Sequence, residues 1–221
     1  MIFRRAIFDM DGTLVDSLGI WEILWMKMGS AYLNDGSFRP TDADDKLFRT
    51  MLLKDVMALI HKNYHIGKSG EELLNFANEV LAWFYREEVC LKPGVREFLD
   101  YLQAQRIKMC IATATEKKLV ALVIEHCDLY KYFSAVISCA DVGKGKEAPE
   151  VFLEACARME TSIEDTCVFE DSLLAIQTSK AAGFKTVGIF DKNNYGQAQL
   201  KKTADVYIDE GETLERLIRR S

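Results

Sequence analysis

A run of nine residues near the amino terminus constrains this 221-residue chain most strongly. Residues 9–17 read DMDGTLVDS, and the short apolar stretch RAIF at residues 5–8 precedes them. An apolar stretch containing a β-branched residue is typical of a buried strand, and Gly12 allows the backbone to turn directly afterwards. The pattern predicts a strand that delivers Asp9 and Asp11 at its carboxyl end, where open parallel sheets bind ligands.

Two carboxylates held this close together repel each other, so the site is expected to hold a cation, to share a proton, or both. We therefore interpret Asp9 and Asp11 as the centre of a metal-assisted reaction in which Asp9 is the nucleophile. An acidic turn and part of a calcium loop are the alternatives. An EF-hand loop needs Gly at its sixth position, whereas Gly12 is only the fourth residue of this run.

Composition excludes several other classes of protein. Hydrophobic residues make up 49% of the chain and charged residues 28%, which is enough to build a globular core. A net charge of −6 without a basic run argues against sequence-independent nucleic-acid binding. The six cysteines lack C-x-x-C spacing, and no stretch resembles a signal peptide or a membrane helix, so we expect a cytoplasmic, soluble protein with reduced thiols.

The remaining chain divides into two regions of different periodicity. Residues 17–89 show helical spacing of apolar residues and no convincing strand, with Ser17 as a candidate N-cap. From Lys92 onward, strand-like and helix-like stretches alternate, which predicts a parallel sheet with helices on both faces. The expected architecture is a doubly wound, Rossmann-like α/β core formed by residues 1–16 and 90–221, with an inserted all-helical cap domain at residues 17–89.

The predicted strand ends bring a characteristic set of side chains to one edge of the sheet. Besides the two aspartates, the set contains a hydroxyl from Thr113, an ammonium from Lys146, and the carboxylates of Glu170 and Asp171. Magnesium prefers oxygen ligands of this kind, and a lysine with a hydroxyl suits phosphoryl oxygens. The set therefore predicts phosphoryl transfer with Mg²⁺ as cofactor, although Asp171 and Ser172 are also candidate N-caps of the following helix.

These motifs, in this order, resemble the haloacid dehalogenase superfamily, in particular its β-phosphoglucomutase-like phosphatase branch. The resemblance extends from residue 3 to about residue 208 and rests on DMDGTLVDS, Thr113, Lys146 with APE at 148–150, and EDS at 170–172. It implies that Asp9 is the nucleophile, Asp11 the general acid and base, and Thr113 and Lys146 the phosphate ligands. It further implies that Asp9, Asp11 (through its backbone carbonyl), Asp171 and Glu170 serve the metal.

Three positions depart from the family pattern. Glu147 replaces a common proline and is expected to pair with Lys144 or Lys146, and Ala175 replaces a common glycine. Trp21 lies where β-phosphoglucomutases proper have a histidine, which favours a phosphatase over a phosphomutase.

Several polar residues of the helical region are candidates for a function or for a position at the surface. Arg49, Lys54 and His61 are candidate contacts for the leaving group. His61 and His65 lack the glutamate of a zinc-protease helix. Three aspartates are expected to face solvent at the start of a helix, namely Asp42, Asp44 and Asp45.

The expected substrate is a small phosphorylated metabolite such as a sugar phosphate or phosphoglycolate, and the expected assembly is a monomer or weak homo-oligomer. A phosphomutase of the β-phosphoglucomutase type and a catalytically silent binding or regulatory module are the competing hypotheses. The presence of both aspartates argues against the silent module.

Overall fold

The computed structural model describes residues 3–49 and 51–220, and the described chain forms two compact units. One unit runs up to Leu18 and resumes at Val89, and the other spans Gly19–Glu88. The first unit contains all the strands of the described residues, whereas the second is helical.

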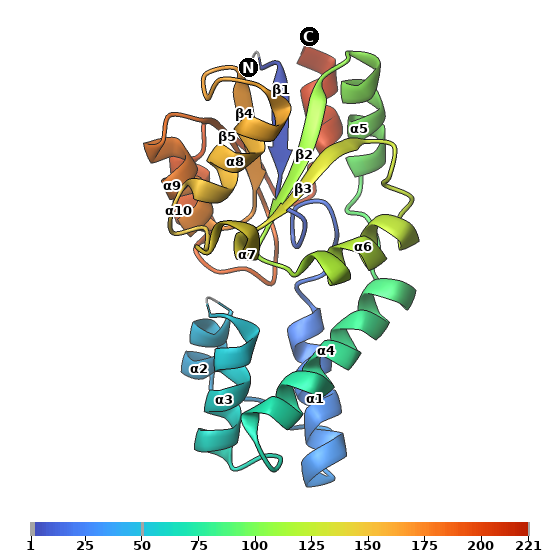
Figure 1. The fold of residues 1–221 in the computed structure, drawn as a ribbon, viewed down its shortest axis with the longest axis vertical. Helices are drawn as coiled ribbons and strands as arrows, with labels where there is room; N and C mark the ends of the chain where they lie inside the picture. The colour runs from blue at the N-terminus through green and yellow to red at the C-terminus, as the bar shows by residue number, and fades with distance from the viewer. Residues whose placement is uncertain (1–2, 50, 221) are drawn as a thin grey trace. The chain divides into compact units, whose positions relative to one another are not determined.

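A parallel sheet forms the centre of the first unit (Figure 1). Its order is β3-β2-β1-β4-β5-β6, so the chain moves outward in one direction from β1 and in the other direction from β4. The neighbouring strands β1 and β4 thus form the topological switch point, where doubly wound sheets bind ligands. The strands are β1 (Arg5–Phe8), β2 (Lys108–Thr113), β3 (Phe133–Ser138), β4 (Thr166–Glu170), β5 (Lys185–Ile189) and β6 (Val206–Ile208).

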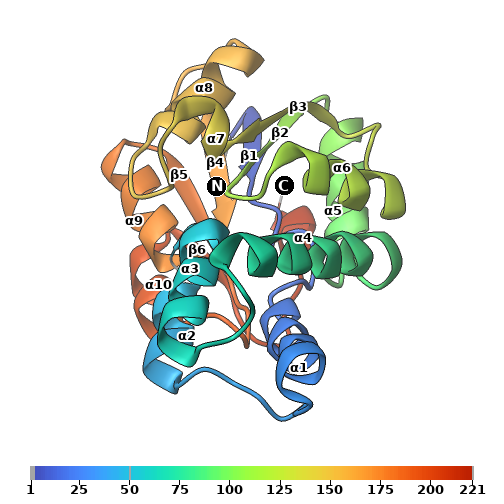
Figure 2. The ribbon, with the colours of Figure 1, turned by 60° about the horizontal axis from the view of Figure 1, so that its bottom comes forward.

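Helices cover both faces of this sheet, which confirms the predicted doubly wound class. Figures 1 and 2 show two helices on one side, α5 (Val95–Ala104) and α6 (Lys117–His126). The opposite side carries α8 (Glu150–Met159), α9 (Leu173–Ala181) and α10 (Gln197–Thr203). The chain also forms a short helix after β3, α7 (Cys139–Val142), and a final 3₁₀ helix, η1 (Leu214–Arg220), against α5.

Apolar side chains from the strands and helices fill the space between these layers. Phe8 in β1 is fully buried and stacks on Phe169 in β4, with ring centroids 4.5 Å apart. Phe98 of α5 contacts both rings, and Phe152 of α8 belongs to the core cluster on the other face. Burial of such rings is a major source of stability, so it holds β1 and β4 firmly in register.

The helical unit consists of four helices in the described residues. They are α1 (Ile20–Leu33), α2 (Asp42–Phe48), α3 (Leu53–Tyr64) and α4 (Gly70–Glu87). The last two form an antiparallel hairpin, and α1 packs against α4. Ser69 accepts a hydrogen bond from the Glu72 backbone amide and so caps the start of α4.

Several local predictions are wrong. Ser17 is not an N-cap, because α1 begins at Ile20 and its N-cap is Gly19. Asp45 is buried instead of facing solvent, because its carboxylate accepts hydrogen bonds from Trp25 Nε1 at 2.8 Å and Arg49 Nε at 2.7 Å.

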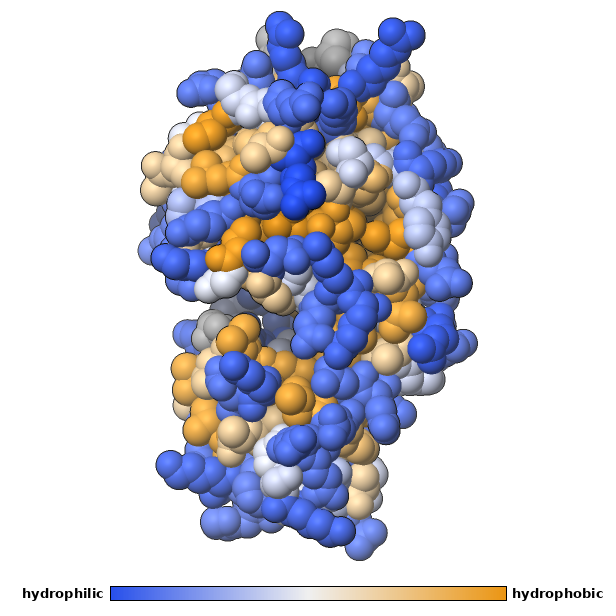
Figure 3. Space-filling model, in the orientation of Figure 1, coloured by the Kyte–Doolittle hydropathy of each residue, from blue (hydrophilic) through white to orange (hydrophobic). Residues whose placement is uncertain are grey.

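The outer surfaces of the two units are mixed in polarity. Figure 3 shows hydrophilic residues distributed over the visible face of each unit, with apolar residues among them. None of the helices in the described part of the chain is long and apolar enough to cross a membrane.

Candidate active site

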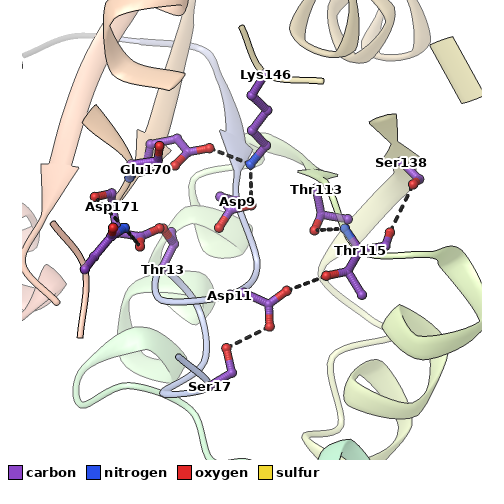
Figure 4. A network of polar contacts seen from close by, with 12 residues as sticks. Asp9, Asp11, Thr13, Ser17, Thr113, Thr115, Ser138, Lys146, Glu170 and Asp171 are labelled. Atoms are coloured by element: carbon purple, nitrogen blue, oxygen red, sulfur yellow. Dashed lines mark hydrogen bonds and ion pairs between the residues drawn. The ribbon is translucent and has the colours of Figure 1, made fainter. Parts of the chain in front are cut away.

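Asp9 follows β1 directly, and its surroundings define the buried half of the site (Figure 4). Its backbone amide donates to the Phe169 carbonyl at 3.0 Å, which extends the pairing of β1 with β4 by one residue. Its carboxylate accepts a hydrogen bond from the ammonium of Lys146, which also donates to Glu170. The side chain of Asp9 is only 8% exposed and that of Lys146 only 11%.

Three buried carboxylates converge at this point. One oxygen from each of Asp9, Glu170 and Asp171 lies within 4.8 Å of the other two. Glu170 is the last residue of β4 and Asp171 follows it, so the register of β1 with β4 brings all three together. The set offers hard oxygen donors in a small volume, which fits the ligand preference of Mg²⁺.

The pKa values of this group reflect burial and like charge. Burial is the main cause that raises the pKa of Asp9, with Lys146 acting in the opposite direction. Burial, followed by the charge of Glu170, raises the pKa of Asp171 to about 7. Burial alone would lower the pKa of Lys146, but Asp9 and Glu170 outweigh it and raise that pKa above its usual value. One lysine therefore faces three carboxylates, an imbalance that a bound cation would relieve.

The turn after β1 packs directly against Asp171. Gly12 adopts a φ of +80°, and a Cβ at this position would clash with the Asp171 carboxylate. The Thr13 hydroxyl donates to Asp171 Oδ1 at 3.1 Å. Only glycine satisfies both the positive φ and the close approach, which explains the residue type in this turn.

Asp11 occupies a different environment, lined by hydroxyl groups (Figure 4). Ser17 Oγ donates to Asp11 Oδ1 and Thr115 Oγ1 donates to Asp11 Oδ2, each at 2.7 Å. The carboxylate of Asp11 therefore lies outside the group of three buried carboxylates. The role of the Asp11 backbone carbonyl as one of the metal ligands stays a prediction.

Thr113 ends β2 and reaches Asp11 only through a neighbour. It is buried, and its Oγ1 accepts a hydrogen bond from the Thr115 backbone amide at 3.1 Å. The Ser138 hydroxyl donates to the Thr115 carbonyl at 3.0 Å, which ties the end of β3 to the same loop. The structure thus brings Thr113 to the same edge as the aspartates, beside the loop that holds Asp11.

The lysine loop and the helix after β4 differ in detail from what the sequence suggests. Glu147 pairs with neither Lys144 nor Lys146, because its Oε1 accepts from the Gly145 amide while Lys144 pairs with Glu150. Asp171 is not the N-cap of α9, and Ser172 occupies that position without a side-chain capping bond.

Other polar residues at this edge are missing from the sequence interpretation. Asn194 Nδ2 donates to Asp171 Oδ2 at 2.6 Å, and Lys92 Nζ donates to the Gly12 carbonyl at 2.6 Å and to Asp191 Oδ2 at 2.8 Å. Asp191 and Asn194 follow β5, whose carboxyl end lies at the same edge as the other strand ends. Extending the strand-end argument to this strand would have identified their loop, whereas Lys92 carries no recognisable motif.

Comparisons with known proteins agree with this arrangement. A model of the haloacid dehalogenase-like hydrolase family matches residues 6–189. A phosphorylated carbohydrates phosphatase from Thermotoga maritima is 29% identical over 215 residues, covering 96% of both chains. A phosphoglycolate phosphatase from Shigella dysenteriae is 30% identical over 214 residues, covering 88% of this chain and 84% of that one.

A solved structure extends the similarity to the whole fold. A Thermotoga maritima protein assigned as a β-phosphoglucomutase has a TM-score of 0.81 and 26% sequence identity, covering 99% of this chain and 100% of the other. The family match spans most of the strands that form the acidic edge, and the curated relatives are named as phosphatases. The chain therefore belongs to the haloacid dehalogenase-like hydrolases, within the phosphatase branch of that family.

Proposed function

We propose that this hydrolase is a Mg²⁺-dependent phosphatase that cleaves a small phosphorylated metabolite through an aspartyl-phosphate on Asp9. The observation that carries the proposal is the ammonium of Lys146 between Asp9 and Glu170, with a carboxylate oxygen of Asp171 within 4.8 Å of both acids. This arrangement combines a nucleophile, a fixed positive charge and a set of hard oxygen donors at one buried point.

In the first step, a carboxylate oxygen of Asp9 attacks phosphorus and the bond from phosphorus to the ester oxygen breaks. Asp11 donates a proton to that leaving oxygen, which departs as an alcohol. The hydroxyls of Ser17 and Thr115 support this role because they orient the Asp11 carboxylate without neutralising it.

In the second step, water attacks the phosphorus of the aspartyl-phosphate. Asp11, now ionised, takes a proton from this water as the bond from phosphorus to the Asp9 oxygen breaks. The products are inorganic phosphate and the original carboxylate of Asp9. Lys146 and the Thr113 hydroxyl are the proposed ligands of the equatorial phosphoryl oxygens, where charge accumulates in the transition state.

The proposed ligands of Mg²⁺ are the carboxylates of Asp9 and Asp171 and the backbone carbonyl of Asp11. Glu170 is proposed to serve the metal from a greater distance. When bound, the cation would neutralise charge on the phosphoryl group and lower the repulsion between the acids. Like-charge crowding at three buried carboxylates supports a cation at this position.

The proposed substrate is a sugar phosphate or a phosphoglycolate-like acid, as the names of the two curated relatives suggest. We further propose that residues 17–89 act as a cap domain that selects it, with residues 15–17 and 88–92 as hinges. Support comes from the helical unit Gly19–Glu88, which the chain enters and leaves next to the acidic edge. There the Asp16 amide donates to the Cys90 carbonyl at 2.9 Å.

The proposed setting is cytoplasmic, as a monomer or weak homo-oligomer without a nucleic-acid or membrane partner. All six cysteines are thiols in the structure, which supports a reducing compartment. The net charge of −6 supports the absence of a nucleic-acid partner.

A phosphomutase of the β-phosphoglucomutase type is the second candidate, because the similar Thermotoga maritima structure carries that assignment. Trp21, in place of the histidine of β-phosphoglucomutases, favours hydrolysis. A catalytically silent module is disfavoured, because such a module has no need of two aspartates with separate hydrogen-bond partners.

The test is phosphate release from a panel of sugar phosphates and phosphoglycolate, each assayed with Mg²⁺ and with a chelator. Release that depends on Mg²⁺ and disappears in Asp9→Asn is the expected result. Conversion between hexose phosphate isomers with little free phosphate would favour the mutase. Absence of both activities across the panel, with Asp9→Asn equal to the wild type, would reject the enzyme proposal.

A further inference from the structure

Lys92 is a largely buried lysine that joins two loops of the acidic edge. Its side chain is 16% exposed, and that of its partner Asp191 is 2% exposed. The ammonium donates to the Gly12 carbonyl at 2.6 Å, to the Phe190 carbonyl at 2.8 Å and to Asp191 Oδ2 at 2.8 Å. All three hydrogens of the ammonium thus have acceptors, which fixes its position.

One of these loops is the turn that follows β1. Gly12 directly follows Asp11 in the chain. Gly12 also packs against the carboxylate of Asp171. Thr13, the next residue, donates to Asp171 Oδ1. A displacement of the Gly12 carbonyl would therefore move one flank of Asp171 together with the backbone of Asp11.

The other loop follows β5, and Asp191 organises it. Its Oδ1 accepts from the Asn193 amide at 2.8 Å, and its carbonyl accepts from the Asn194 amide at 3.1 Å. The side chain of Asn194 then donates to Asp171 Oδ2 at 2.6 Å and to the Asp171 carbonyl at 3.2 Å. Asp191 therefore determines where the second flank of Asp171 lies.

Lys92 also belongs to the segment through which the chain returns from the helical unit. Its amide donates to the Leu14 carbonyl at 2.9 Å, and Leu91 forms an antiparallel bridge with Val15. The outgoing and returning segments are thus paired, and the lysine at their end reaches both loops that hold Asp171.

We propose that Lys92 and Asp191 are a pair of positioning residues that set the Mg²⁺ affinity of the site by fixing both hydrogen-bond donors of the Asp171 carboxylate. This inference rests on the proposed function, because it assigns Asp171 to the metal. Partners of a metal ligand that fix its orientation contribute 10–100-fold, by order of magnitude, to metal affinity or activity.

The test is isothermal titration of the metal-free enzyme with Mg²⁺, without substrate, together with thermal unfolding. Lys92→Met should weaken Mg²⁺ binding by about 10-fold or more. Asp191→Asn keeps the size of the side chain and should weaken binding in the same direction. The double variant should lose no more affinity than the larger single loss, because the two residues act as one unit.

Lys118→Met is the matched control, since Lys118 lies on the outer face of α6 with its side chain 64% exposed and paired with Glu116. It should bind Mg²⁺ as the wild type does. Wild-type affinity in Lys92→Met and Asp191→Asn, with only a lower unfolding temperature, would overturn the proposal and leave a purely structural ion pair. If Lys92→Met does not fold, Asp191→Asn alone decides.

A wild-type enzyme that neither binds Mg²⁺ nor releases phosphate would reject the proposed function itself, and the positioning pair with it. An active wild type whose two variants retain full Mg²⁺ affinity rejects the positioning pair alone. The two failures are therefore distinguishable.

Discussion

Asp9 and Asp11 are two residues apart in the chain, yet the structure surrounds them in opposite ways. Asp9 lies in a buried group with two further acids and one lysine. Asp11 lies among hydroxyls and accepts one hydrogen bond from Ser17 and one from Thr115. The first environment crowds three carboxylates around one lysine, a repulsion that a cation or a proton relieves, whereas the second provides hydroxyl donors to a single carboxylate.

This difference suits a division of labour between the two acids. The proposed nucleophile and metal ligand, Asp9, needs a fixed orientation, and its ion pair with Lys146 supplies one. The proposed acid and base gains and loses a proton in successive steps, and a hydroxyl group can donate to Asp11 in one step and accept from it in the other.

Replacing the nucleophile should abolish turnover. Asp9→Asn should lower kcat by at least about 10⁴-fold, because loss of a nucleophile removes the covalent route. Asp11→Asn should lower kcat by about 10²–10⁴-fold, the range for one acid–base residue. Initial rates of phosphate release measure both effects, and mass spectrometry of quenched wild type should detect phosphate on Asp9. Equal losses in the two variants, without covalent phosphate in the wild type, would contradict the division of roles.

The buried group should make folding less favourable as the pH rises in a chelator. The pKa of Asp171 is about 7 in the folded state and about 3.9 when unfolded, so the folded state binds more protons between these values. The free energy of unfolding should therefore fall from about pH 4 to about pH 7, by a few kcal/mol relative to Asp171→Asn. Urea unfolding of both proteins across this range measures the difference. Parallel pH profiles would contradict it, and Mg²⁺ should restore stability only in the wild type.

The hydroxyl-lined environment should respond differently from the buried group. Thr115→Val removes one donor to Asp11 and should lower kcat by about 10-fold, the equivalent of one hydrogen bond to a charged group. Mg²⁺ affinity should not change, because Thr115 contacts none of the three buried carboxylates through its hydroxyl. Steady-state kinetics and Mg²⁺ titration measure the two quantities. A loss of Mg²⁺ affinity equal to the loss in kcat would show that the two environments are not separate.

A carboxylate outside the site should show the opposite dependence on pH. Burial alone would raise the pKa of Asp205, but hydrogen bonds from Lys180 and Thr186 outweigh it and lower that pKa. Its stabilising effect is present above the unfolded pKa, near 3.9, and is lost as the pH falls through the lower folded pKa. Asp205→Asn should cost less than about 1 kcal/mol at neutral pH. The cost should vanish in acid, which urea unfolding would reveal, and a cost that instead grows in acid would refute this assignment.

The sheet was predictable because its strands are short apolar stretches whose order along the chain defines a parallel fold. Residues 5–8 and 166–169 can be recognised as buried strands from the sequence, since both are mostly apolar and an acid, Asp9 or Glu170, follows each directly. The helix α10 was not expected, because the short polar segment of residues 197–203 carries little apolar periodicity. The burial of Asp45 was not predicted, because it depends on a hydrogen bond from Trp25, which lies in another helix 20 residues earlier in the chain.

The site residues also fall into a group that the sequence predicts and a group that it does not. Residues at strand ends, such as Asp9, Glu170 and Asp171, could be placed at one edge from strand order alone. Lys92 could not, because it contacts the backbone of Gly12, a residue far away in the sequence, and carries no recognisable motif. Ser17 was misassigned for a related reason: helix capping is local and visible in a sequence, whereas its bond to Asp11 depends on how the turn folds back.

The pairing of residues 14–16 with residues 90–92 has a consequence for how such chains diversify. Because the Asp16 amide bonds to the Cys90 carbonyl, the segment between them begins and ends at one place, like a long hairpin loop of the α/β unit. Loops with adjacent ends tolerate large changes in length at little entropic cost. A helical insert of different length could therefore replace this one by recombination without changing the strands of the acidic edge, and the proposed cap could acquire a new substrate preference in this way.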